Sequence, residues 1–110
     1  MSRTRREVMP RTPIHPGEIL KDELDEFGVA AAELARQLEV PANRVSQILA
    51  GKRAVTADTA LRLARWFGTS TQLRMNLQQT YELDLARQRL GAAIERIPTR
   101  DAASPPAAAP

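Results

Sequence analysis

Apolar residues recur every three or four positions through most of the chain, which is the spacing of one face of an α-helix. This spacing is interrupted at Gly28, Pro41, Gly51 and Gly68, residue types that end a helix or begin the next one. Aromatic residues make up only 4% of the chain, so its core is expected to consist of Leu, Ile, Val and Ala. The sequence therefore predicts an all-α fold with five helices, at about residues 16–27, 31–38, 41–50, 56–67 and 70–90.

Each predicted helix carries an apolar face suited to a shared core. The first four faces comprise Ile19, Leu20, Leu24 and Phe27; Leu34, Ala35 and Leu38; Val45, Ile48 and Leu49; and Ala60, Leu61, Leu63, Ala64 and Phe67. Leu73, Leu77 and Tyr81 form a stripe on the fifth helix, and Trp66 lies off the main stripe of the fourth, where we expect it to be half exposed.

The two short helices within residues 30–50 meet at a tight corner. Pro41 disfavours the helical conformation at Val40, so the first helix ends before it. Proline also suits the first turn of a helix, so the second helix begins there. Glu39 stands where many such corners place glycine, so either Glu39 adopts a left-handed conformation or the corner has another shape. This arrangement is typical of a helix-turn-helix, although a three-helix corner with a solvated polar face would show the same pattern.

The charge distribution favours nucleic-acid binding over that alternative. The net charge is +3, but residues 18–40 are mostly acidic, whereas residues 41–55 contain three cations and no acid. Two of these cations, Lys52 and Arg53, directly follow the glycine that ends the second motif helix. Because flanking phosphates lie beside that position in a helix-turn-helix complex, this segment is a candidate DNA contact.

The predicted base-reading residues are those at the start of the second motif helix that point away from the core: Ala42, Asn43, Ser46 and Gln47. Asn and Gln side chains can each form a bidentate contact with adenine, and a small alanine can pack against a thymine methyl group. Arg44 could reach either a guanine or a phosphate, and we favour phosphate. Lys52 and Arg53 are predicted phosphate contacts that fix register without reading sequence.

The composition excludes several other functions. Without Cys, and with His15 as the single histidine, the chain can form neither a disulfide nor a thiolate or multi-histidine metal site, so no metal and no cofactor is expected. The carboxylates cluster on an outward helix face and no glycine-rich phosphate loop is present, so we expect no enzyme activity. The chain has neither a membrane span nor an apolar leader, which predicts a cytoplasmic protein with no membrane partner.

The two ends differ from the middle of the chain. Residues 1–13 read as a flexible basic arm, residues 14–97 as the DNA-binding and dimerisation domain, and residues 98–110 as a disordered tail rich in Pro and Ala. Apolar positions continue through 83–97, beyond what five helices need to close a core. We expect this surplus face to form a homodimer on a palindromic operator with half-sites about 34 Å or a multiple apart. The alternative is that the segment folds back at Gly91.

Three blocks of sequence, HPGEIL at 15–20, VPANRVSQILAGKRAVTADTALRLARWFGTS at 40–70 and NLQQTYEL at 76–83, resemble the HigA family of antitoxins. That family lies within the phage-repressor-like (XRE) helix-turn-helix group, and the resemblance covers about residues 13–97. It implies a five-helix phage-repressor-like domain with a helical C-terminal extension. The family usually carries Trp where this chain has Arg74, so Arg74 is expected to be exposed or to pair with an acid.

The same resemblance implies a function. It indicates a DNA-binding antitoxin of a type II toxin-antitoxin module, which neutralises a RelE-like ribonuclease toxin of the HigB type and represses its own operon. Two alternatives remain open at this point: a free-standing XRE-type repressor without a toxin partner, and a protein-binding inhibitor whose helix-turn-helix no longer binds DNA.

Overall fold

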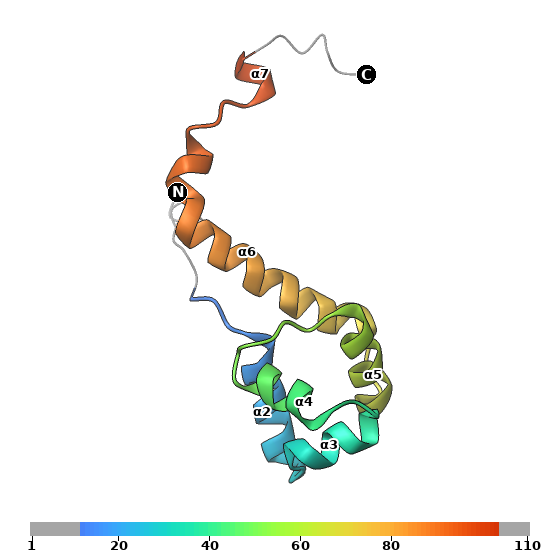
Figure 1. Ribbon diagram of the computed structural model, residues 1–110. Helices are drawn as coiled ribbons and strands as arrows, with labels where there is room; N and C mark the ends of the chain where they lie inside the picture. Colours follow the sequence, from blue (N-terminus) through green and yellow to red (C-terminus); the bar gives the residue numbers. More distant parts are fainter. Residues whose placement is uncertain (1–11, 104–110) are drawn as a thin grey trace.

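The computed structural model describes residues 12–103, which form helices and connecting loops without a β-strand (Figure 1). The helices are α2 (Pro16–Phe27), α3 (Ala31–Leu38), α4 (Ala42–Leu49), α5 (Ala57–Phe67), α6 (Thr71–Glu95) and the single turn α7 (Arg100–Ala103). The predicted all-α class and the five main helices are confirmed. The largest difference is the end of α6, which continues to Glu95 instead of ending near residue 90. Most of residues 1–13 and the stretch 104–110 lie outside the described residues.

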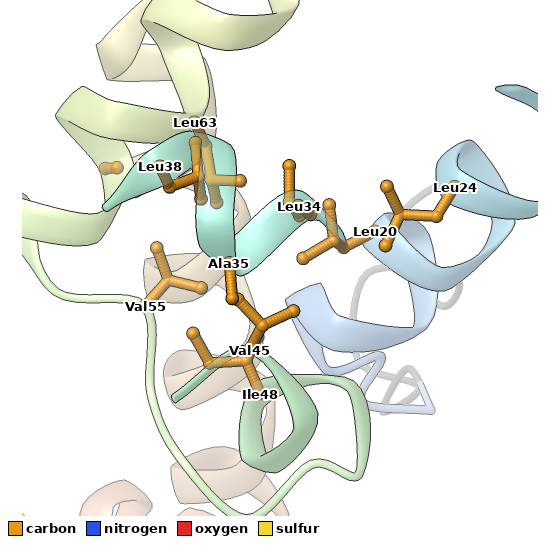
Figure 2. Close-up of a cluster of buried hydrophobic side chains, with 10 residues drawn as sticks. Leu20, Leu24, Leu34, Ala35, Leu38, Val45, Ile48, Val55 and Leu63 are labelled. Carbon is orange, nitrogen blue, oxygen red and sulfur yellow. The ribbon is translucent and has the colours of Figure 1, made fainter. Parts of the chain in front are cut away.

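Helices α2 to α5 enclose one small aliphatic core (Figure 2). Leu34 of α3 and Ala60 of α5 are completely buried, and Ala35 is 1% exposed where α3 packs against α4. The small side chain of Ala35 thus allows the two motif helices to approach closely. Val55, from the loop before α5, completes the core and was not predicted. The buried apolar residues are Leu20, Leu24, Leu34, Ala35, Leu38, Val45, Ile48, Val55, Ala60, Leu63 and Ala64.

Three apolar residues that the helical pattern assigns to apolar faces are exposed in the structure: Phe27, Leu61 and Leu73. Phe27 is 58% exposed because it is the last residue of α2 and leans on the aromatic rings of Trp66 and Phe67 at the surface. Leu61 is 60% exposed because α5 buries Thr59, Ala60, Leu63 and Ala64 instead. Leu73 is 48% exposed, since the buried side of α6 lies one position further round the helix. Trp66 is half-buried, as predicted.

The buried side of α6 is polar. Arg74 and Gln78 are 5% and 4% exposed, and both reach partners distant in sequence. Arg74 forms a bidentate ion pair with Glu23 of α2, with N···O distances of 2.8 and 3.1 Å. The Oε1 atom of Gln78 accepts a hydrogen bond from the backbone N–H of Val55 at 2.8 Å. Polar groups at these positions therefore fasten α6 to α2 and to the loop that follows α4.

The helix-turn-helix corner has a left-handed residue. Glu39 adopts φ 61° and ψ 46°, and the backbone N–H of Val40 donates to the carbonyl of Ala35 at 3.0 Å, which is the Schellman arrangement. From α5, Nη1 of Arg62 donates to the carbonyl of Leu38 at 2.7 Å and so caps the end of α3. Of the two shapes open from the sequence, the chain therefore uses the left-handed corner with glutamate in place of glycine.

Replacing Glu39 with glycine is expected to raise the free energy of unfolding by about 0.5–1 kcal/mol. A left-handed conformation costs a residue with a Cβ atom roughly 1–2 kcal/mol, and the greater flexibility of glycine in the unfolded chain cancels part of that gain. Chemical denaturation of the variant measures the effect, with Glu39→Ala as the control that keeps the Cβ atom. A glycine variant no more stable than the alanine variant would contradict the prediction.

The C-terminal half of α6 leaves the core. This helix runs through Gly91 without a break, and Leu83, Leu90 and Ile94 are 52%, 51% and 54% exposed, so the segment does not fold back at Gly91. Figure 1 shows α6 extending away from the α2–α5 cluster. Beyond it, α7 forms a helical turn inside the segment 98–110, for which the sequence predicts no regular structure. Residues 100–103 complete that turn because no glycine or proline interrupts them.

Candidate nucleic-acid interface

Helix α4 is positioned by an unusually close contact with the start of α2. A Cβ atom on Gly17 would lie 1.8 Å from the backbone oxygen of Ile48, which no packing adjustment of a side chain could relieve. Nδ1 of His15 accepts a hydrogen bond from the N–H of Gly17 at 2.8 Å and so caps α2. Neither residue was predicted in this role from the sequence, although a polar side chain directly before Pro-Gly at a helix start is a recognisable capping signal.

His15 also connects three elements. Its ring is buried and packs edge-on against the ring of Tyr81 in α6, with 4.8 Å between the ring centroids. The loop after α4 lies against the same ring, since a Cβ atom on Gly51 would be 3.8 Å from Cγ of His15. Burial lowers the pKa of His15, because the interior disfavours the charged imidazolium. A neutral His15 therefore holds the start of α2 and the loop after α4 together against α6.

The outer face of α4 presents the predicted base-reading residues. Ala42, Asn43 and Ser46 are exposed, and Gln47 is half-buried. The Oγ of Ser46 donates to the backbone carbonyl of Asn43 at 3.3 Å, one turn earlier. Ser46 and Gln47 follow Asn43 by three and four positions, so both side chains lie on the same side of the helix as that of Asn43. The structure thus places these four residues together, while their contact with DNA stays a prediction.

Arg44 differs from its neighbours because it is engaged inside the protein. Its Nη1 lies 3.1 Å from Oδ2 of Asp58, at the start of α5, and the Arg44 side chain is 27% exposed. Arg62 binds the other oxygen of Asp58 through Nε at 2.7 Å. Hydrogen bonds from Arg62, and secondarily from Arg44, lower the pKa of the Asp58 carboxyl. Arg44 therefore ties α4 to α5, and only part of its charge faces solvent.

The two remaining cations follow α4 on a tight turn. Gly51 adopts φ 76°, and the N–H of Lys52 donates back to the carbonyl of Gln47 at 2.8 Å. Lys52 and Arg53 are both exposed, but Nε of Arg53 donates to Oε1 of Gln47 at 2.9 Å. From the sequence, the two cations have the same predicted role. In the structure they differ, because the Arg53 side chain contacts Gln47 on the face of α4.

Comparisons with known proteins agree with this geometry. The helix-turn-helix family model HTH_3 matches residues 20–73. A virulence-associated protein I of Dichelobacter nodosus is 47% identical over 76 residues, covering 68% of this chain and 70% of the relative. The solved structure of an addiction module antidote protein of a HigA family from Coxiella burnetii superposes with a TM-score of 0.79 at 48% identity, over 81% of this chain and 98% of that one. The chain belongs to the HigA family.

Another HigA protein, the Pseudomonas aeruginosa antitoxin solved with the higBA promoter, has a TM-score of 0.76 and 48% identity, over 79% of this chain and 97% of its own. As a HigA-family member the chain is a DNA-binding helix-turn-helix protein and not an enzyme. Between residues 12 and 103, no three His, Asp or Glu side chains are grouped to hold a metal ion. No helix in the same range is long and apolar enough to cross a membrane.

Arg74 stands where the resemblance to the HigA family leads us to expect Trp. It lies 4.3 Å over the ring of Phe67 while pairing with Glu23. The flat guanidinium thus stacks on an aromatic ring, as an indole could, and also binds a carboxylate. Of the two outcomes expected from the sequence, exposure or pairing with an acid, the structure shows pairing.

Proposed function

We propose that this protein is the antitoxin of a type II toxin-antitoxin module, which represses its own operon and neutralises a RelE-like ribonuclease toxin. The observation that carries the DNA-binding half is the exposed polar face of α4, with Asn43 and Ser46 outward and Lys52 exposed at the flank. The Pseudomonas relative was solved with its higBA promoter, which supports a promoter of the protein's own operon as the DNA target. The toxin half is supported by family membership alone.

The proposed DNA-binding form is a homodimer through α6. The half-exposed side chains of Leu83, Leu90 and Ile94, together with Ile97 at 62% exposure, form an apolar stripe too long for a solvated helix face. A two-fold pairing of these stripes would place two copies of α4 on one side of a palindromic operator, with half-sites about 34 Å or a multiple apart. Light scattering at micromolar concentration should give the mass of a dimer, and a monomer mass both with and without DNA would refute this arrangement.

Binding titrations test the DNA-binding half. On a duplex from upstream of the protein's own gene, Asn43→Ala is expected to cost roughly 1–3 kcal/mol and to relax the preference at one base pair. Lys52→Ala should weaken binding to this duplex and to a scrambled one alike, and should flatten the dependence on salt by about one unit of slope. Fluorescence anisotropy at several salt concentrations measures both. An operator-to-scrambled affinity ratio that Asn43→Ala leaves unchanged would mean that Asn43 reads no base.

Co-expression tests the toxin half. The reading frame next to the gene is expressed alone and then together with this protein, and cell growth and messenger RNA integrity are compared. An antitoxin is expected to restore growth and to halt messenger RNA cleavage. If the neighbouring product is harmless on its own, the protein is a free-standing repressor, the alternative that the sequence leaves open.

A further inference from the structure

We propose that Gln47 and Arg53 act as one unit that reads guanine in the major groove. This replaces two separate assignments from the sequence, an adenine contact for Gln47 and a phosphate contact for Arg53. The inference rests on the proposed function, in which α4 is the DNA-reading helix, and deepens it by naming a base and the pair of side chains that recognises it.

The backbone turn after α4 creates the unit. Gly51, in its left-handed conformation, reverses the chain, and the hydrogen bond from Lys52 N–H to the Gln47 carbonyl closes the turn at 2.8 Å. The turn brings the side chain of Arg53 back to α4, six residues from its partner, where Nε donates to Oε1 of Gln47 at 2.9 Å. Buried contacts hold the backbone of this loop, because Gly51 lies against the His15 ring and the N–H of Val55 donates to Gln78.

The chemistry of arginine determines which way the Gln47 amide points. A guanidinium has five N–H donors and no acceptor, so the Gln47 atom that faces Nε has to be the carbonyl oxygen. The Nε2 amide group of Gln47 is then left as a donor. The terminal nitrogens of Arg53 find no acceptor among residues 12–103, and they are donors as well. Apart from the second lone pair of Gln47 Oε1, the free polar groups of the unit are therefore all donors.

A surface made of donors matches guanine. In the major groove guanine presents two adjacent acceptors, N7 and O6, whereas adenine presents an acceptor beside the N6 donor. In a bidentate adenine contact, Oε1 of Gln47 would accept from N6 through its remaining lone pair, but the N6 donor would then face the donors of Arg53, whereas O6 of guanine accepts from them. Thymine offers a single acceptor next to a methyl group. Guanine is thus the base whose edge satisfies both members of the unit.

Lys52 provides the contrast within the same loop. Its side chain is exposed and has no partner in the described part of the chain, so it is a mobile point charge suited to a phosphate. In Arg53, the hydrogen bond from Nε to Gln47 orients the guanidinium group and leaves its two terminal nitrogens available as donors. An oriented guanidinium fork can donate to two adjacent acceptors at once, and N7 and O6 of guanine are such a pair.

The test begins with selection of duplexes from a random pool by the full-length wild-type protein. Affinities are then measured for the selected duplex and for every single base-pair variant of it. We expect one guanine in each half-site whose replacement by adenine weakens wild-type binding about tenfold or more. Replacing that guanine with 7-deazaguanine, which lacks the N7 acceptor, should weaken wild-type binding as well.

Variants then separate a shared unit from independent contacts. Arg53→Lys keeps the charge but loses the donor fork, and Gln47→Ala removes the partner. Each should abolish the preference for guanine at that same base pair, and the double variant should lose no more than either one. Lys52→Ala is the matched control, which should weaken all duplexes by one common factor. Thermal unfolding of each variant verifies that these substitutions leave the fold intact.

Two other results would overturn the inference. If the base pair that responds to Gln47→Ala is selected as adenine, or if Arg53→Lys behaves as Lys52→Ala does, then Gln47 and Arg53 act separately. A different failure, in which the wild-type protein enriches no sequence from the pool, would count against the proposed DNA-binding function itself. The pool selection and the variant titrations therefore distinguish the two.

Discussion

Replacing Glu23 with alanine should lower the free energy of unfolding by about 3 kcal/mol, whereas replacing Arg74 with methionine should lower it by less than about 1 kcal/mol. The two substitutions break the same ion pair but leave different groups behind. Arg74 is 5% exposed and its Nε is buried without a partner in the described residues, so loss of Glu23 leaves a buried cation unpaired. Loss of Arg74 leaves Glu23, which is 31% exposed and can be hydrated. Breaking a buried pair from one side costs 3–5 kcal/mol, and the partial exposure of Glu23 favours the lower end.

Chemical denaturation of the two single variants and the double variant measures this asymmetry. In the double variant, Glu23→Ala together with Arg74→Met, the unpaired cation is gone, so most of the stability lost in Glu23→Ala should return. Methionine retains a flexible apolar contact with Phe67, which keeps the packing comparable. Equal destabilisation by the two single variants would instead mean that the ion pair is itself a large net contribution to stability.

A single methyl group added at Gly17 should destabilise the fold by about 3 kcal/mol or more. The new Cβ would lie 1.8 Å from the backbone oxygen of Ile48, and a backbone atom cannot rotate away as a side chain can. Overpacking typically costs 1–3 kcal/mol, and this contact is at the severe end because α2 or α4 has to move as a whole. Thermal unfolding measures the loss, and a displaced α4 should also weaken binding to the operator.

Gly91→Ala is the matched control for this prediction. Gly91 also lies within a helix, but a Cβ there would meet nothing within 4 Å. Since alanine favours the helical state over glycine by about 1 kcal/mol, this variant should be as stable as the wild type or slightly more stable. An unfolding midpoint for Gly17→Ala that matches that of Gly91→Ala would show that the contact between α2 and α4 is looser than described.

The helices could be predicted from the sequence because the signals that define them are local. Apolar spacing, Pro16 at the start of α2 and Gly68 after α5 each act within a few residues, and the observed helix ends follow them closely. The aliphatic core followed for the same reason. The prediction that Phe27 and Leu61 are buried was wrong because periodicity shows which residues share a face, but not how much of that face a neighbouring helix covers.

The polar contacts that position the candidate site could not be predicted in this way. Gln78 meets Val55 from 23 residues away, and Arg74 meets Glu23 from 51 residues away. From sequence alone, a polar residue on a helix is predicted to face solvent unless its distant partner is known. The alignment of Arg53 with Gln47 escaped prediction for a related reason, since it depends on the turn at Gly51 and not on helical spacing.

The unbroken course of α6 has a consequence for how operators could diversify. Near its start, this helix binds the loop after α4 through Gln78. Near its end it carries Ile94, about 24 Å away at 1.5 Å per residue. In the proposed dimer, the separation of the two half-sites would depend on α6, whereas the bases within each half-site would depend on α4 and its following turn. Each residue added to or removed from α6 would rotate the apolar stripe by about 100° relative to the reading helix. Half-site spacing and base preference would then be determined by different segments of the chain, so that one could change in evolution while the other was preserved.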